Sequence, residues 1–134
     1  MLKFSLENPI YFKLGSYVEC NFGLFEVCDL QKPAFNTNTA GYDYELRLDA
    51  YYWKWKNKIF KYTPETTGQE ASWNLTAPLD VQAGIVLRNL KALGYTYKGQ
   101  DFVFSIDSTV ENKSQLMSYD NINILDACFE MAKK

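Results

Sequence analysis

The stretch that decides the fold is YDYELRLDAYYWKWKNKIFKY, residues 42–62. From Tyr42 to Ala50, apolar and charged side chains alternate with a period of two, which is typical of a half-buried strand. After Ala50 the phase reverses, and the aromatic rings take the positions that were charged before. Because side chains alternate strictly along a strand, this reversal predicts a bulge, bend or break at Ala50-Tyr51-Tyr52. The alternative is one unbroken strand whose second half is buried against a partner chain.

Strand-like patterns also fill most of the chain before residue 77. Apolar and polar residues alternate in short runs separated by Asn, Pro and Gly, as in small antiparallel sheets. The predicted strands here are residues 2–6, 10–14, 17–20, 24–28 and 71–75. Residues 17–20 and 24–28 are expected to form a hairpin whose turn contains Gly23. Residues 32–41 are rich in Pro, Asn and Thr and are expected to form a loop.

The first helix is predicted over residues 78–93. Thr76 is the expected N-cap, Pro78 suits the first turn, and Gly94 ends the helix. Its apolar stripe is wider than one face because Val81 and Ile85 lie beside it. A stripe of that width predicts a helix wedged between two surfaces.

The second helix is predicted over residues 121–133, with Asp120 or Asn121 as its N-cap. Between the two helices, short strands are expected at residues 95–97, 102–106 and 115–119. The predicted fold class is therefore α+β, with an antiparallel, partly closed sheet or barrel of about six to eight strands and two helices.

The length of 134 residues fits a single domain, residues 1–134. The sequence contains no apolar run long enough to span a membrane and no signal-peptide pattern, so we expect a cytosolic product that does not enter a membrane.

Composition favours a binding or structural module over an enzyme. The chain contains no histidine, which excludes Ser-His-Asp and Cys-His catalysis and removes the commonest zinc ligand. The three cysteines, Cys20, Cys28 and Cys128, are widely spaced and form no Cys-x-x-Cys pair. Neither glycine-rich phosphate-binding loop is present. We expect no enzymatic activity, no metal and no cofactor.

The segment YYWKWKNKIFKY, residues 51–62, interleaves aromatic rings with lysines. A half-buried strand with lysines on its wet face explains this pattern most simply. Bases of single-stranded DNA could stack on the rings while Lys54, Lys56 and Lys58 bind phosphates, but the net charge of −2 offers no general attraction, so nucleic acid is not an expected partner. A glycan-binding β-module would use Tyr51, Trp53 and Trp55 as an exposed platform, and it is the alternative function.

Asp43, Glu45 and Asp49 are candidate catalytic carboxylates. Asp43 and Glu45 lie two positions apart on one strand face, roughly 6–7 Å, which is within the range of glycosidase pairs. Arg47 continues the same row, however, and nothing nearby would raise the pKa of one carboxyl. The row is therefore interpreted as a solvated strand face.

The order of these features resembles the N-terminal region of prophage tail proteins of the baseplate hub or tail-tip group, often labelled tail-associated endopeptidase or tail fibre proteins. The stretches that carry the resemblance are FSL (4–6) with LGSYV (14–18), YDYELRL (42–48), WNLTAP (73–78) with VLRNL (86–90), and LMSYDN (116–121) with ILDA (124–127). Together they cover nearly the whole chain in order.

The resemblance implies a β-rich hub domain that assembles as a ring, with a trimer favoured, and that contacts other phage tail proteins. It implies a virion structural protein of the tail, made and assembled in the bacterial host cytoplasm, with any lytic activity in later domains of a longer protein. The apolar surface predicted from the phase reversal after Ala50 and from the wide stripe of the first helix would then be buried between subunits. The residues expected at that interface are Tyr51, Trp53, Trp55, Val81 and Ile85.

Overall fold

A computed structural model describes residues 1–29, 32–66 and 70–134. The fold is α+β, as predicted, and every ladder between its described strands is antiparallel. The chain divides into two compact units, Met1–Trp53 and Lys54–Lys134, which are described one at a time. None of the described sheets closes into a barrel.

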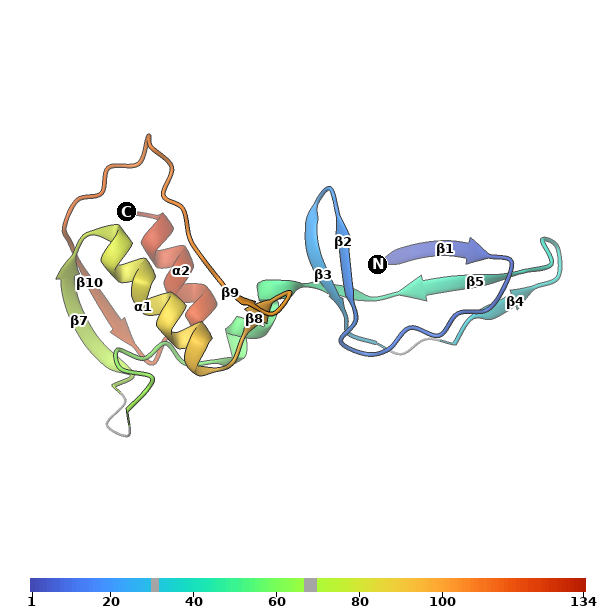
Figure 1. Ribbon diagram of the computed structural model, residues 1–134, viewed down its shortest axis with the longest axis horizontal. Helices are drawn as coiled ribbons and strands as arrows, with labels where there is room; N and C mark the ends of the chain where they lie inside the picture. Colours follow the sequence, from blue (N-terminus) through green and yellow to red (C-terminus); the bar gives the residue numbers. More distant parts are fainter. Residues whose placement is uncertain (30–31, 67–69) are drawn as a thin grey trace. The chain divides into compact units, whose positions relative to one another are not determined.

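Figure 1 labels the elements along the chain. The strands are β1 (Leu2–Leu6), β2 (Tyr17–Cys20), β3 (Gly23–Val27), β4 (Ala34–Asn36), β5 (Gly41–Leu46), β6 (Leu48–Ala50), β7 (Ser72–Ala77), β8 (Thr96–Tyr97), β9 (Gln100–Asp101) and β10 (Gln115–Asp120). The helices are the 3-10 helix η1 (Tyr51–Asn57), α1 (Leu79–Ala92) and α2 (Ile124–Ala132).

The first sheet of the N-terminal unit has the strand order β1-β5-β4. β1 pairs with β5 along its whole length, from Leu2 opposite Leu46 to Leu6 opposite Tyr42. β4 is a three-residue edge strand inside the stretch predicted as a loop, so that prediction is wrong for these residues. Pro33 precedes the strand, where its missing N–H removes no ladder bond.

Tyr44 on β5 organises the packing of this sheet. Its ring stacks on Phe4 at 4.8 Å between centroids and meets Phe12 edge-on at 5.7 Å. Its hydroxyl donates to the carbonyl oxygen of Ile10 at 2.8 Å and accepts from the Ile10 N–H. Ile10 therefore pairs with a side chain, and residues 10–14, predicted as a strand, belong to no ladder.

The second sheet of the N-terminal unit has the order β2-β3-β6. The predicted hairpin is confirmed, because β2 pairs with β3 from Tyr17 opposite Glu26 to Cys20 opposite Gly23. On its other side β3 pairs with β6, and the Cys28 N–H donates to the Arg47 carbonyl at 3.2 Å just beyond that ladder.

The phase reversal in residues 42–62 marks a real break in the chain. β6 ends at Ala50 and η1 begins at Tyr51, so the break lies where the reversal predicted it, and the alternative of one unbroken strand is wrong. A 3-10 helix repeats every three residues. Tyr51, Trp53 and Trp55 therefore do not share one face, as they would on a strand.

The C-terminal unit is built on a two-stranded sheet of β7 and β10, which pair from Ser72 opposite Asp120 to Ala77 opposite Gln115. Alternate residues of both strands turn inward to meet the helices. The buried core cluster comprises Phe60, Trp73, Ile85, Val86, Leu90, Met117, Tyr119, Ile124, Ala127 and Met131. Residues 115–119 were predicted as a strand, and β10 confirms them.

The first helix matches its prediction in extent and differs at its cap. α1 ends where expected, with Gly94 at φ +71° donating its N–H to the Lys91 carbonyl at 2.9 Å. Thr76 is not the N-cap, because it lies inside β7. Pro78 takes that position, and no side chain caps the helix there.

The second helix is confirmed, but Asp120 and Asn121 are not its N-cap. β10 extends through Asp120, and a bridge between Ile59 and Asn123 carries the chain further before the helix starts. Asn123 caps α2 by accepting from the Asp126 N–H at 2.8 Å. Among the described residues, no helix is both long and apolar enough to cross a membrane.

Residues 102–106, predicted as a strand, belong to no ladder. The short hairpin of β8 and β9 ends at Asp101, and the chain then runs without regular structure to β10 (Figure 1). The composition of these residues is strand-like, but a strand also requires a partner edge, and none of the described strands supplies one.

Candidate functional site

The five residues predicted at an interface divide between the two units. Tyr51 is buried at 5% exposure, and its ring meets that of Tyr17 at 5.3 Å between centroids, inside the N-terminal unit. Trp53, which follows closely, is 49% exposed. Trp55 is half-buried in the C-terminal unit, where its ring meets Phe102 edge-on at 5.5 Å.

The two helix residues of the predicted set also differ from each other. Ile85 is 4% exposed and belongs to the core of the C-terminal unit, whereas Val81 is 49% exposed on α1. Trp53 and Val81 therefore present apolar surface, and Tyr51 and Ile85 stabilise the fold around them. That the set forms a subunit interface stays a prediction.

The geometry does not favour a glycan platform of Tyr51, Trp53 and Trp55. Such a platform needs exposed rings along one face, whereas Tyr51 is buried in the N-terminal unit and Trp55 is half-buried in the C-terminal unit. Among the lysines of the same segment, Lys54 places its ammonium 5.0 Å from the centre of the Tyr95 ring.

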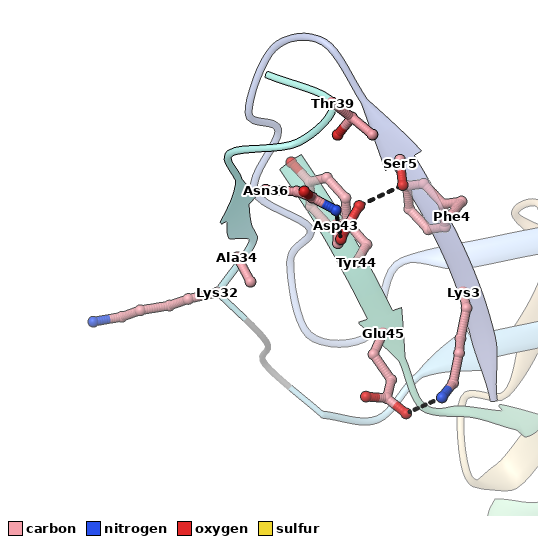
Figure 2. A pocket seen from close by; sticks show the side chains of 10 residues that line it. All are labelled: Lys3, Phe4, Ser5, Lys32, Ala34, Asn36, Thr39, Asp43, Tyr44 and Glu45. Carbon is pink, nitrogen blue, oxygen red and sulfur yellow. Dashed lines mark hydrogen bonds and ion pairs between the residues drawn. The ribbon is translucent and has the colours of Figure 1, made fainter. Parts of the chain in front are cut away.

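The N-terminal unit contains an open cavity of about 620 Å³ on the sheet of β1, β5 and β4, lined by both polar and apolar side chains. Figure 2 shows its ten lining residues, with Asp43 at the centre between Ser5 and Asn36. The Asp43 carboxylate accepts hydrogen bonds from Ser5 Oγ at 2.5 Å and from Asn36 Nδ2 at 2.9 Å. These three residues come from three adjacent strands, so the cluster ties β1 and β4 to the central strand.

The chemistry of this cavity is that of a fixed carboxylate. The hydrogen bonds from Ser5, and then from Asn36, hold the pKa of Asp43 below its usual range. Glu45 forms an ion pair with Lys3 at 3.0 Å (Figure 2). An Asp held in its ionised form cannot serve as the protonated acid of a glycosidase pair at neutral pH. The interpretation of this row as a solvated strand face therefore agrees with the geometry.

The most conspicuous property of the N-terminal unit is its exposed apolar surface, whose extent the residue pattern alone does not predict. The buried apolar side chains among its described residues are Val27, Tyr44, Leu46 and Tyr51. The exposed large ones are Met1, Leu2, Ile10, Tyr11, Leu14, Tyr17, Phe22, Phe35, Tyr52 and Trp53. Phe22, in the β2–β3 turn, is 91% exposed, and Phe35, on the edge strand β4, is 58% exposed. The alternation of apolar and polar residues does not distinguish exposed apolar side chains from buried ones. Their exposure becomes evident only from the arrangement of the strands in the structure.

Comparison of the chain with protein-family models, with curated proteins and with solved structures gives no match in any of the three.

Proposed function

We propose that this chain is a structural component of a phage tail, a domain of the baseplate hub or tail-tip group that acts by associating with other subunits. The observation that carries the proposal is the imbalance in the N-terminal unit between buried and exposed apolar residues. Four apolar side chains are buried among its described residues, and ten large ones are exposed. The resemblance noted above supplies the identity of the assembly.

A unit of this size cannot derive much stability from so small a core. Domains well below about 70 residues need disulfides, metals or oligomerisation, because a single small core contributes only a few kcal/mol. The described cysteines are all free, and the described residues contain no cluster able to hold a metal ion. Association with neighbouring subunits would bury the exposed rings and stabilise the unit.

The strand edges of the N-terminal unit suit the same role. Its two sheets have three strands each, so β1 and β4 flank one sheet, and β2 and β6 flank the other. An edge strand presents backbone N–H and C=O groups that can pair with a strand of another subunit. Phe35 on β4 and Tyr17 on β2 add exposed rings to two of these edges.

The proposed partners are further copies of this chain, with a trimeric ring favoured, and neighbouring tail proteins. In this proposal, residues 1–134 form the N-terminal hub domain of a longer tail protein, which assembles in the bacterial host cytoplasm and resides in the virion tail. The function requires no cofactor and no chemical step.

Sedimentation velocity of Phe35→Ser and Leu116→Ser tests the association directly. Both side chains are exposed and apolar, at 58% and 63%, but Phe35 lies in the N-terminal unit and Leu116 on β10 of the C-terminal unit. The proposal predicts that the unmodified chain and Leu116→Ser self-associate as concentration rises, and that Phe35→Ser associates more weakly. Equal weakening by both substitutions would contradict a role of the N-terminal unit.

A further inference from the structure

A second cavity, of about 720 Å³, lies within the C-terminal unit, between the two helices and the chain that joins β9 to β10. We call it the helix cavity. Its apolar lining comprises Trp55, Leu79, Ala83, Val86, Leu87, Leu90, Phe102, Val103, Phe104, Ile106, Val110, Met117, Cys128, Met131 and Ala132. Sites for small molecules are typically about 300–1,000 Å³ and mainly apolar, with a few polar groups that orient the ligand.

The helix cavity is elongated along α1. Its lining residues on this helix run from Leu79 to Leu90, which at 1.5 Å per residue corresponds to about 16 Å. The wide apolar stripe of α1 thus has two sides. Ile85 belongs to the core shared with the sheet, while Ala83 and Leu87 line the cavity.

One end of the helix cavity is aromatic. The ion pair between Lys91 and Asp101, at 3.2 Å, places the end of β9 beside the C-terminal end of α1. Phe102 follows directly, and its ring meets the ring of Trp55 edge-on at 5.5 Å. Trp55, Phe102 and Leu90, the last lining residue of α1, thus give this end an apolar lining.

The opposite end is polar. The Asp80 N–H, in the first turn of α1, donates to Asn112 Oδ1 at 3.2 Å, and Gln82 Nε2 donates to the Gln115 carbonyl at 3.1 Å. These bonds place Glu111 and Lys113, two lining residues, beside the N-terminal end of α1.

The charges in the lining are balanced. Glu111 and Lys113 form an ion pair at 2.6 Å, and the Asp107 carboxylate accepts from the Thr109 N–H at 2.8 Å. The charged lining residues are thus two acids, Asp107 and Glu111, and two bases, Lys113 and Lys134. A ligand with a net charge gains nothing from such a rim, whereas an uncharged polar group can hydrogen-bond to it.

We propose that the helix cavity binds a single-chain amphiphile with an uncharged polar head group, such as a fatty alcohol. The alkyl chain lies along α1 and reaches Trp55 and Phe102, and the head group lies at the end marked by Glu111 and Lys113. Transfer of the alkyl chain out of water drives the binding, because apolar surface on both partners becomes buried.

A neutral dye and a neutral ligand test this proposal on the full chain. N-phenyl-1-naphthylamine should bind with an increase in fluorescence, and dodecanol should displace it. Ala83→Phe places a ring in the cavity and should weaken the affinity for the dye and for dodecanol by about tenfold or more each. The matched control is Ala92→Phe, on the same helix at an exposed position outside the lining, and it should bind as the unmodified chain does.

A second measurement needs no substitution. Cys128 lines the cavity and Cys20 is exposed in the N-terminal unit, so dodecanol should slow alkylation of Cys128 by iodoacetamide and leave Cys20 unaffected. The reaction is run at mildly alkaline pH below the unfolded thiol value of 9.0, because burial raises the pKa of the Cys128 thiol to about 11 and higher pH would destabilise the unit.

Three results would overturn the proposal. The first is equal dye binding by Ala83→Phe and Ala92→Phe, which would place the dye elsewhere. The second is tighter binding of dodecanoate or dodecyltrimethylammonium than of dodecanol, which would contradict the uncharged head group. The third is protection of Cys128 by protein concentration alone, since the side chains of a second copy would then fill the cavity.

Discussion

The side-chain amide of Asn89 pairs with the backbone of Lys61 in both directions, accepting from its N–H at 3.0 Å and donating to its carbonyl at 2.8 Å. Asn89 is 2% exposed on α1 and donates a further bond to the Ile85 carbonyl at 2.9 Å. The Asn89 amide therefore forms the same pair of backbone hydrogen bonds with the segment before β7 that a neighbouring strand would form. It holds the chain after Phe60, a core residue, against the helix.

Replacement of Asn89 by Ala should lower the free energy of unfolding of the C-terminal unit by about 2–3 kcal/mol, because it removes both hydrogen bonds to the Lys61 backbone and the bond to the Ile85 carbonyl at a position where Asn89 is 2% exposed. Chemical denaturation followed by tryptophan fluorescence measures this change. Asn74→Ala, at an exposed position on β7, is the control and should change stability by less than about 0.5 kcal/mol. A similar loss for both variants would mean that the Asn89 pairing contributes little.

Gly84 within α1 and Gly94 just beyond its C-terminal end should respond in opposite directions to alanine. Gly94 has φ +71°, a conformation that L side chains rarely adopt, so Gly94→Ala should destabilise by about 1 kcal/mol. Gly84 lies inside α1, and a Cβ there would meet nothing within 4 Å, so Gly84→Ala should stabilise by about 0.5–1 kcal/mol. Thermal unfolding of the two variants measures both. Equal effects in the same direction would contradict the assigned helix end.

Alkaline pH should destabilise the C-terminal unit through Tyr119. Burial raises the pKa of its phenol to about 12 from 10.0, and its hydroxyl donates to Gln82 Oε1 at 3.0 Å. The folded state therefore keeps its proton where the unfolded state loses it. This contribution is complete below about pH 10 and is lost as pH rises toward 12, at a cost on the order of 2–3 kcal/mol.

Denaturation curves between pH 8 and 12 measure this loss. Cys128, whose thiol pKa burial raises to about 11, adds a second fall of the same sign that begins lower, near the unfolded thiol value of 9.0. Tyr119→Phe should flatten the decline above pH 10, and an unchanged pH profile in that variant would show that the tyrosine does not cause it.

Acid should loosen the first sheet of the N-terminal unit through Asp43. Its pKa is lowered in the folded state by Ser5 and Asn36, so the stabilisation it provides is present above the unfolded value of 3.8 and is lost as pH falls below it. The protection factors for amide hydrogen exchange in β1 and β4, which correct for the intrinsic exchange rate at each pH, should therefore fall in acid, and Asp43→Asn should remove this dependence. Glu45→Gln is the control and should leave this dependence in place, because the ion pair between Glu45 and Lys3 is exposed and contributes little to stability.

Much of the fold could be predicted because strict local rules apply to it. A strand cannot change its buried face, so the reversal at Ala50 marked the end of β6. Pro78 and Gly94 marked the ends of α1 because each residue suits only a few backbone conformations. The rest depends on partners distant in sequence. Asn123 caps α2 because pairing with β7 and Ile59 carries the preceding chain past Asp120.

The same reason explains what was missed at the candidate sites. β4 exists because β5 offers it an edge, and residues 102–106 have no such edge among the described strands. Gln82 and Asn89 look like exposed helix residues, yet both are 2% exposed, because the groups that satisfy them are backbone atoms far along the chain. The apolar periodicity of α1 does not predict those hydrogen-bond partners.

Our central proposal is that this chain is a component of a phage tail. Mass spectrometry of purified virions, combined with gold-labelled antibodies against residues 1–134, tests it most directly. The account predicts peptides of this chain in the particles, in a copy number that is a multiple of three, with label at the distal end of the tail. Virions that contain every other tail protein but lack this chain would contradict it.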